Sequence, residues 1–370
     1  MTNIEKDISR VAIATGATRE EAVSNALALV RKDILAKIRG RVLIKPNFLS
    51  SVTPLAATQA GAVRPVLELL RDAGYDMRSV VIAEGGSRST PRALDNFGYR
   101  DLAREYGVEC VDLNHDTCSR SFGIVTAKGG AQIAEYSDFA AEADTVISVP
   151  IAKTHDTAGV TLSLKNMMGC LKRVHRPRMH GITIPDGISR IAEAAWNAIE
   201  GHPMVIKSFS GVVFTAVNHL RAHDVRRNSG RHTGLLRQVG AMAENLCRLG
   251  RILLPDIAVI DAFEAMEGNG PGSAGTAVDM RVAVTGTDAV ACDAVMAHLM
   301  GYDPLEVGYL ALAHECGLGT ADIDDIGIVG CDPSEVMRSF TPHSNHSLHL
   351  QWREGLKLVG VEQPESSVKV

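Results

Sequence analysis

Short apolar runs alternate with helical patterns along most of this 370-residue chain, and this alternation limits the fold more than any other feature. The runs are rich in Val and Ile and lack the strict polar–apolar alternation of a half-exposed strand, which predicts strands buried on both faces. We expect strands at Val42–Lys45, Val80–Ala83, Glu109–Leu113, Thr145–Val149, Ile257–Ile260, Arg281–Thr285 and Asp325–Val329.

The segments between these runs carry apolar residues at helical spacing. We expect helices at Glu20–Ile38, Val63–Ala73, Ala93–Tyr106, Ile188–Ile199, Asp288–Leu299 and Glu306–Cys316. Strands and helices in alternation predict an α/β fold with mostly parallel, helix-covered sheets, arranged as two Rossmann-like lobes with a cleft between them.

The length of the chain suggests two domains. We expect an N-terminal α/β lobe over residues 1–145 and a second α/β lobe over residues 146–370. Residues 201–251 lack strong strand character and are rich in His, Arg and Asn, so we predict an insertion or lid there.

Composition excludes several classes of protein. No apolar run reaches the roughly 20 residues that a membrane-spanning helix needs, and the first residues lack the pattern of a signal peptide. The seven cysteines contain no CxxC pair, which predicts a cytoplasmic protein without a cysteine-ligated iron–sulfur cluster. A net charge of -5 and 4% aromatic residues argue against nucleic acid as a partner, and a homo-oligomer stays open.

Charge is segregated along the chain. From Lys165 to Arg178 there are five Lys or Arg and no acidic residue, whereas residues 255–337 hold fifteen Asp or Glu against the single Arg281. These segments could be solvated faces, or could pack against each other. The alternative that we develop is a basic, histidine-bearing site that receives a small anion.

In a parallel sheet, ligands bind beyond the carboxyl ends of the strands, so the residues after each predicted strand are candidates for function. Lys45 and Asn47 stand at the end of one strand, and a glycine-bearing loop with Ser87 and Arg88 follows the next. We predict all four as substrate-binding residues, with a solvated lysine and a plain capped turn as the structural alternatives.

The stretch after Thr145–Val149 holds most of the reactive side chains. We predict His155 as a general acid/base, with Lys153 and Lys165 as catalytic cations that bind or polarise an anion. Further predicted substrate-binding residues in this stretch are Thr157, Asn166 and Arg176. Any one of these could instead be a structural residue of the core.

A divalent metal is a second hypothesis for the same region. The candidate ligands are His175, His180, Asp261 and Asp288. Asp261 and Asp288 follow predicted strands and offer the hard oxygen ligands that divalent cations prefer, although Asp288 could equally be a helix N-cap. The histidine spacing is not that of a zinc site, since there is no HExxH and no cysteine partner.

The chain resembles the domain-of-unknown-function 362 family. The matching segments include IKPNFLS (44–50), AEGGS (83–87), ISVPIAKTHDTAGVTLSLKNMMGCL (147–171) and TGTDAVACDAVMAHLMGYDP (285–304). The resemblance covers nearly the whole chain apart from residues 201–251, and it names no reaction. Some members carry appended ferredoxin-like cysteine motifs, which this sequence lacks.

A more distant resemblance is to the lactate racemase superfamily, through His155-x-x-Ala158-Gly159-x5-Lys165. It implies His155 as acid/base, Lys165 as the lysine that carries a nickel-pincer cofactor, and His180 as an approximate match for a metal ligand. The chain departs from that pattern: Leu162, Ser163 and Leu164 replace the glycines before the lysine, and Gly86, Ser87 and Arg88 stand where a second acid/base histidine is expected.

Two function hypotheses follow. The first is an enzyme that acts on a small, carboxylate-type metabolite by histidine acid/base chemistry, either as an isomerase or epimerase or in a redox reaction with a bound metal or cofactor. The second is a non-catalytic protein that binds a metabolite or a metal in the same place.

Overall fold

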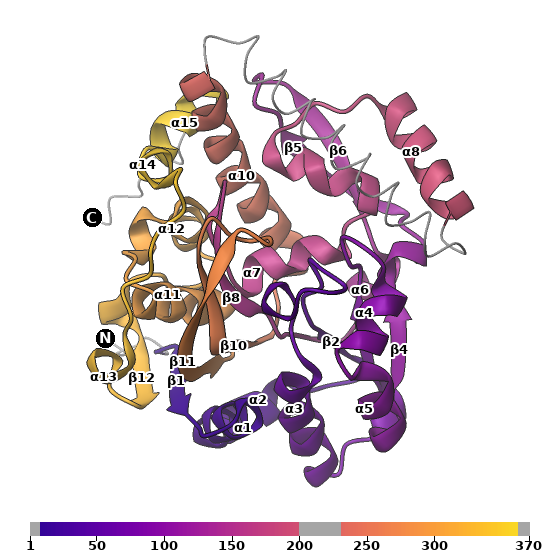
Figure 1. Ribbon diagram of the computed structural model, residues 1–370, viewed down its shortest axis with the longest axis vertical. Helices are drawn as coiled ribbons and strands as arrows, with labels where there is room; N and C mark the ends of the chain where they lie inside the picture. The colour runs from indigo at the N-terminus through magenta and orange to yellow at the C-terminus, as the bar shows by residue number, and fades with distance from the viewer. Residues whose placement is uncertain (1–7, 200–230, 362–370) are drawn as a thin grey trace, which may run out of the picture.

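The computed structural model describes residues 8–199 and 231–361, which fold around one ten-stranded sheet (Figure 1). Eight strands run in the order β12-β1-β11-β10-β7-β2-β3-β4, and β8 and β9 extend the sheet beside β10. These strands are β1 (Arg10–Thr15), β2 (Val42–Lys45), β3 (Val80–Glu84), β4 (Glu109–Asp112), β7 (Thr145–Ser148), β8 (Ile151–His155), β9 (Gly159–Thr161), β10 (Ile257–Gly268), β11 (Gly275–Gly286) and β12 (Gly327–Gly330). A separate hairpin pairs β5 (Arg120–Val125) with β6 (Ala131–Tyr136).

The sheet is mixed but mostly parallel. β10, β7, β2, β3 and β4 run parallel to one another, as do β1 and β12, whereas β11 is antiparallel to both β1 and β10. This confirms the predicted α/β class. Strands from both predicted domains join the same sheet, so the structure does not show two lobes, and the boundary at residue 145 stays a prediction.

Both faces of the sheet are covered by helices, which is why the strands read as continuous apolar runs. Along β2, Leu43 packs into one apolar cluster while Val42 and Ile44 pack into the other, on the opposite face. The helices are α1 (Arg19–Leu29), α2 (Arg31–Lys37), α3 (Ala60–Asp72), α4 (Thr90–Asn96), α5 (Tyr99–Tyr106), α6 (Asp138–Ala141), α7 (Ser163–Asn166), α8 (Asp186–Ile199), α10 (Arg231–Leu253), α11 (Ala289–Leu299), α12 (Gly308–Glu315), α13 (Pro333–Val336), α14 (His346–His349) and α15 (Trp352–Leu358).

Every strand expected from the sequence is present, and five strands were not expected. β1, β5, β6, β8 and β9 are additional, and β10 and β11 are twelve residues long instead of four or five. β8 follows β7 after only Val149 and Pro150, so one apolar stretch of the sequence contains two strands. Lys153 and His155 therefore lie within a strand, not in the loop that the sequence predicts.

Residues 231–251 of the predicted insertion belong to α10, which packs into the core through Met242 and Leu246. Residues 201–230 lie outside the described residues. No helix in the ranges 8–199 and 231–361 is long and apolar enough to cross a membrane.

The crossing of α10 and α15 makes a stability prediction. A Cβ on Gly240 would collide with the backbone of Gly355, whereas a Cβ on Gly187, within α8, would meet nothing within 4 Å. We expect Gly240→Ala to lower the free energy of unfolding by about 1–3 kcal/mol. Gly187→Ala should be neutral or raise it by up to about 1 kcal/mol, because alanine favours helix.

Urea unfolding of both variants measures this difference. Equal stability of Gly240→Ala and the wild-type protein would contradict the close packing of these two helices.

Candidate functional site

The carboxyl ends of three adjacent parallel strands bring polar side chains together inside the protein. Lys45, Glu84 and Ser148 are the last residues of β2, β3 and β7, and β2 lies between the other two strands. We call the group that forms around them the strand-end cluster. Its members are Lys45, Asn47, Glu84, Ser148, Lys153, Lys165, Asn166 and Arg176.

A buried ion pair lies at the centre of this cluster. Lys45 is 0% exposed and Glu84 is 3% exposed, and the ammonium group of Lys45 donates to Glu84 Oε2. The second carboxylate oxygen of Glu84 accepts from the amide of Phe48 at 3.2 Å. Truncating either partner would leave an uncompensated buried charge, which costs about 3–5 kcal/mol.

Asn166, the last residue of α7, connects the ends of β2 and β7. Its Nδ2 donates to the carbonyl of Lys45 and to Ser148 Oγ, both at 3.0 Å. Its Oδ1 accepts from Lys45 Nζ and from Asn47 Nδ2, both at 3.1 Å. All four hydrogen-bonding positions of this amide are used, so Asn166 organises the cluster.

Lys153 enters the cluster from β8. Its ammonium group donates to Asn47 Oδ1 at 2.5 Å and to the carbonyl of Ala56 at 3.3 Å. Burial, together with repulsion from Lys165 and Lys45, lowers the pKa of Lys153 to about 7, against a weaker opposing effect of Glu84. This lysine therefore exchanges its proton near neutral pH.

Lys165 is 9% exposed, and its environment differs from that of the other two lysines. The only hydrogen-bond acceptor that its Nζ meets among the described residues is the thioether of Met168, at 3.7 Å. Burial lowers the pKa of Lys165 to about 8, and the charge of Asp156 opposes this. A thioether is a weak acceptor, so the ammonium group lacks an oxygen partner.

Asp293 positions the short helix that carries Lys165 and Asn166. Its carboxylate accepts from the amides of Ser163 at 2.7 Å and Leu164 at 2.9 Å, and burial raises its pKa to about 8. Neither Asp293 nor Glu84 is predicted as a site residue from the sequence. A single acidic residue in the apolar helix α11, and an acidic residue directly after a buried strand, were the available signals.

Arg176 connects the loops around the strand-end cluster through hydrogen bonds. The sequence predicts it as an anion ligand, but its guanidinium makes five hydrogen bonds to protein oxygens, on Gly85, Gly86, Asn114, Gly169 and Leu171. Glycine is required at position 169, because a Cβ there would lie 2.6 Å from both Lys45 Nζ and Glu84 Oε2.

His155 lies at the end of β8, 3% exposed, in a setting that can hold either neutral tautomer of the ring. Its Nδ1 is 3.0 Å from the amide nitrogen of Thr157 and 3.1 Å from that of Ala158. The same Nδ1 is 3.1 Å from Asp156 Oδ1. The amides favour a proton on Nε2, whereas the carboxylate favours a proton on Nδ1.

His180 stacks on His155, with ring centroids 5.6 Å apart and 26° between the planes. Thr157, another predicted site residue, contacts both Asp156 and His180. Its hydroxyl donates to Asp156 Oδ1 at 2.9 Å and lies 3.3 Å from His180 Nδ1. The structure thus brings together the predicted acid/base and one predicted metal ligand.

The other predicted metal ligands lie apart, each with its own role. His175 accepts from the amide of Glu135 at 3.1 Å, and burial lowers its pKa to about 4. Asp261 pairs with Arg19 at 2.8 Å, and burial raises its pKa. Asp288 caps α11 by accepting from the amide of Ala291 at 2.9 Å.

Among the described residues no three His, Cys, Asp or Glu side chains are placed to hold a metal ion. The four predicted ligands therefore do not form one site there. Ser87 and Arg88 lie on the loop after β3, with Ser87 exposed and Arg88 half-buried.

The sequence of this chain matches a protein family over most of its length. Residues 42–298 match the family described as Domain of unknown function (DUF362). The chain is 23% identical over 284 residues to the "Thylakoid-associated protein sll1697" of Synechocystis sp. (strain ATCC 27184 / PCC 6803 / Kazusa), a match that covers 75% of this chain and 68% of that protein.

Among solved structures, the chain is similar to the lactate racemase apoprotein from Thermoanaerobacterium thermosaccharolyticum. The TM-score is 0.42 and the identity is 15%, over 78% of this chain. The match spans 57% of the length of that racemase chain.

The lowered pKa of Lys153 predicts how stability depends on pH. The folded state binds fewer protons than the unfolded state between about pH 7 and pH 10, so stability should rise with pH in this window. Relative to Lys153→Met, the wild-type protein should gain roughly 1 kcal/mol of unfolding free energy per pH unit above about pH 7.

Urea unfolding at several pH values measures this difference, with Lys32→Met, at an exposed position, as the matched control. A difference between wild type and Lys153→Met that does not change with pH would show that Lys153 keeps its proton throughout.

Proposed function

This chain belongs to the Domain of unknown function (DUF362) family, whose description names no reaction, so we propose its function from the strand-end cluster and His155. The proposal is an enzyme that binds a small carboxylate at Lys165 and Lys153 and moves a proton next to a carbonyl group, with His155 as acid/base.

The main support for this proposal is the excess of positive over negative side chains in the buried strand-end cluster. Four cationic side chains that are at least nine-tenths buried, Lys45, Lys153, Lys165 and Arg176, accompany one equally buried carboxylate, Glu84. Glu84 is paired with Lys45, and Arg176 is fully occupied by protein oxygens. The positive charges of Lys153 and Lys165 thus have no carboxylate within the cluster to balance them. An anion stabilises buried ammonium groups better than water does.

Lys165 is the principal anion ligand in this proposal. Its ammonium group meets a thioether and no protein oxygen among the described residues, so a ligand carboxylate would supply the missing acceptor. An N–H⁺···O⁻ hydrogen bond in a buried site is roughly twice as strong as a neutral one. Lys153, beside it, would hold a carbonyl oxygen and stabilise the negative charge that develops there when a neighbouring C–H proton leaves.

His155 supplies the proton transfer. With its Nδ1 proton directed at Asp156, the neutral ring presents Nε2 as a base, and the imidazolium that forms, its Nδ1 proton still held by the Asp156 carboxylate, returns a proton from Nε2. A ring that can be held in both states suits the abstraction of a proton and its return, as in isomerisation or epimerisation. A bound metal or cofactor would add redox chemistry, but no step here depends on one.

Exchange of solvent deuterium tests the proposal and does not require the product to be identified. Glycolate, lactate and malate are incubated with the protein in heavy water, and exchange of the C–H proton on the carbon next to the carboxylate is followed by proton NMR. We expect exchange in at least one of them, and a loss of about 100-fold or more in His155→Gln, since general acid–base catalysis contributes about that much.

His298→Gln, outside the strand-end cluster, is the matched control and should keep full exchange. The melting temperature of His155→Gln should stay within a few degrees of the wild-type value. Saturable binding of carboxylates without exchange in the wild-type protein would favour the non-catalytic alternative and overturn the assignment of His155.

A further inference from the structure

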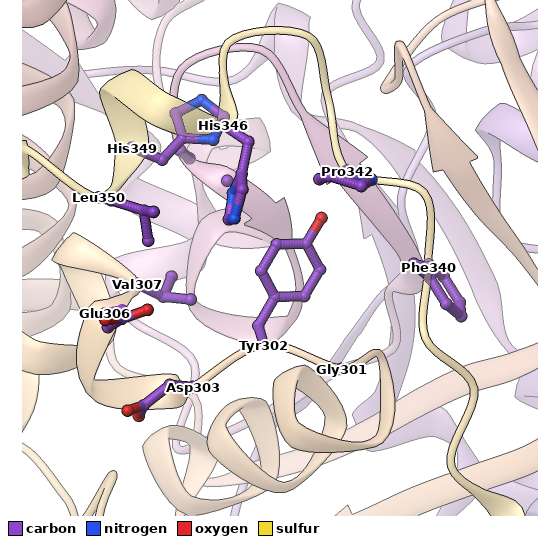
Figure 2. A pocket seen from close by; sticks show the side chains of 12 residues that line it. Gly301, Tyr302, Asp303, Glu306, Val307, Phe340, Pro342, His346, His349 and Leu350 are labelled. Carbon is purple, nitrogen blue, oxygen red and sulfur yellow. The ribbon is translucent and has the colours of Figure 1, made fainter.

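A second candidate site lies beside the turn that follows His155. A cavity of about 260 Å³ opens between the loop from α11 to α12, the segment 340–350 and the turn at Ala158 and Gly159 (Figure 2). It shares no lining residue with the strand-end cluster.

The charge of this cavity is opposite to that of the strand-end cluster. None of its twelve lining residues is Lys or Arg, while Asp303 and Glu306 contribute carboxylates. His349 adds no positive charge near neutral pH, since burial lowers its pKa to about 4. The acid-rich C-terminal half of the sequence therefore supplies a site that attracts cations and repels anions.

Two buried polar atoms at this cavity have no hydrogen-bond partner in the described structure. They are Tyr302 Oη and His346 Nδ1. Their rings meet edge to face with centroids 5.6 Å apart, and Figure 2 shows both side chains directed into the pocket from opposite walls. A buried polar atom without a partner costs about 1–3 kcal/mol, which a ligand that donates hydrogen bonds would relieve.

The remaining wall is apolar. Phe340 is 6% exposed, and Val307 and Leu350 contribute aliphatic surface. The cavity therefore offers hydrogen-bond acceptors and negative charge in one part and an apolar surface in another, with room for a compound of about the size of a small amino acid or arylalkylamine.

We propose that this cavity binds a small primary ammonium compound with an apolar body. N–H groups of the ammonium would donate to Tyr302 Oη and His346 Nδ1, and the carboxylates of Glu306 and Asp303 would attract its positive charge. The aromatic face of Tyr302 adds a cation–π attraction, and the apolar body packs against Phe340 and Val307.

The site adjoins the catalytic turn without depending on the proposed reaction. His349 Nε2 and Asn345 Nδ2 both donate to the carbonyl of Asp156, at 3.1 and 2.9 Å. Ala158, whose amide contacts His155, lines the cavity. Ala158 and Gly159 of this turn thus form part of the cavity wall.

Isothermal titration calorimetry with 2-phenylethylamine tests the proposal. We expect saturable binding of one molecule per chain, and no comparable binding of 3-phenylpropionate, which has a similar shape and the opposite charge. Glu306→Gln should weaken binding of the amine about 10-fold, because a negative charge is lost from the cavity wall, and Tyr302→Phe should weaken it because a hydrogen-bond acceptor is lost.

Two control variants locate the effect. Glu335→Gln removes the same charge from α13, outside the cavity, and should leave the affinity unchanged. Lys165→Met disables the strand-end cluster and should also leave it unchanged. Equal affinity for 3-phenylpropionate, no saturable binding of the amine, or equal weakening by Glu335→Gln would each overturn the proposal.

Discussion

The site depends on one constraint: more positive than negative charge is buried at the carboxyl ends of β2, β3 and β7. The Lys45–Glu84 pair neutralises itself, and no other carboxylate in the strand-end cluster balances Lys153 and Lys165. Desolvation of two such ammonium groups is expensive unless they lose their protons or gain an anion. Their lowered pKa values, about 7 and about 8, show how the protein accommodates them without a ligand.

The surrounding structure holds this unfavourable arrangement in place. Arg176 ties the loops after β3 and α7 together through backbone carbonyls, and Asn166 joins the ends of β2 and β7. Asp293 accepts hydrogen bonds from the first two amides of α7 and so positions the short helix that carries Lys165. These contacts use neutral or fully satisfied groups, which leaves the two lysines as the reactive part of the cluster.

Much of the fold could be predicted from the sequence, because strands buried on both faces have a simple apolar pattern. The same logic predicted that Lys45, Lys153, Lys165 and Asn166 come together, since residues after parallel strands meet at one edge, while their roles stay a prediction. Partners distant in the chain could not be predicted. The amide of Glu135 satisfies His175 and Arg19 pairs with Asp261, so neither side chain is available as the sequence suggests. The acidic residues of the C-terminal half did not by themselves predict the cavity beside Tyr302 and His346.

An anion bound in the strand-end cluster should restore the protons that burial removes from Lys153 and Lys165. Calorimetric titration of malonate, an unreactive dicarboxylate, in two buffers of different ionisation enthalpy measures the protons taken up on binding. We expect net proton uptake at about pH 8, where both lysines are partly neutral, and much less uptake at about pH 6. No binding, or binding without proton uptake at about pH 8, would contradict this expectation.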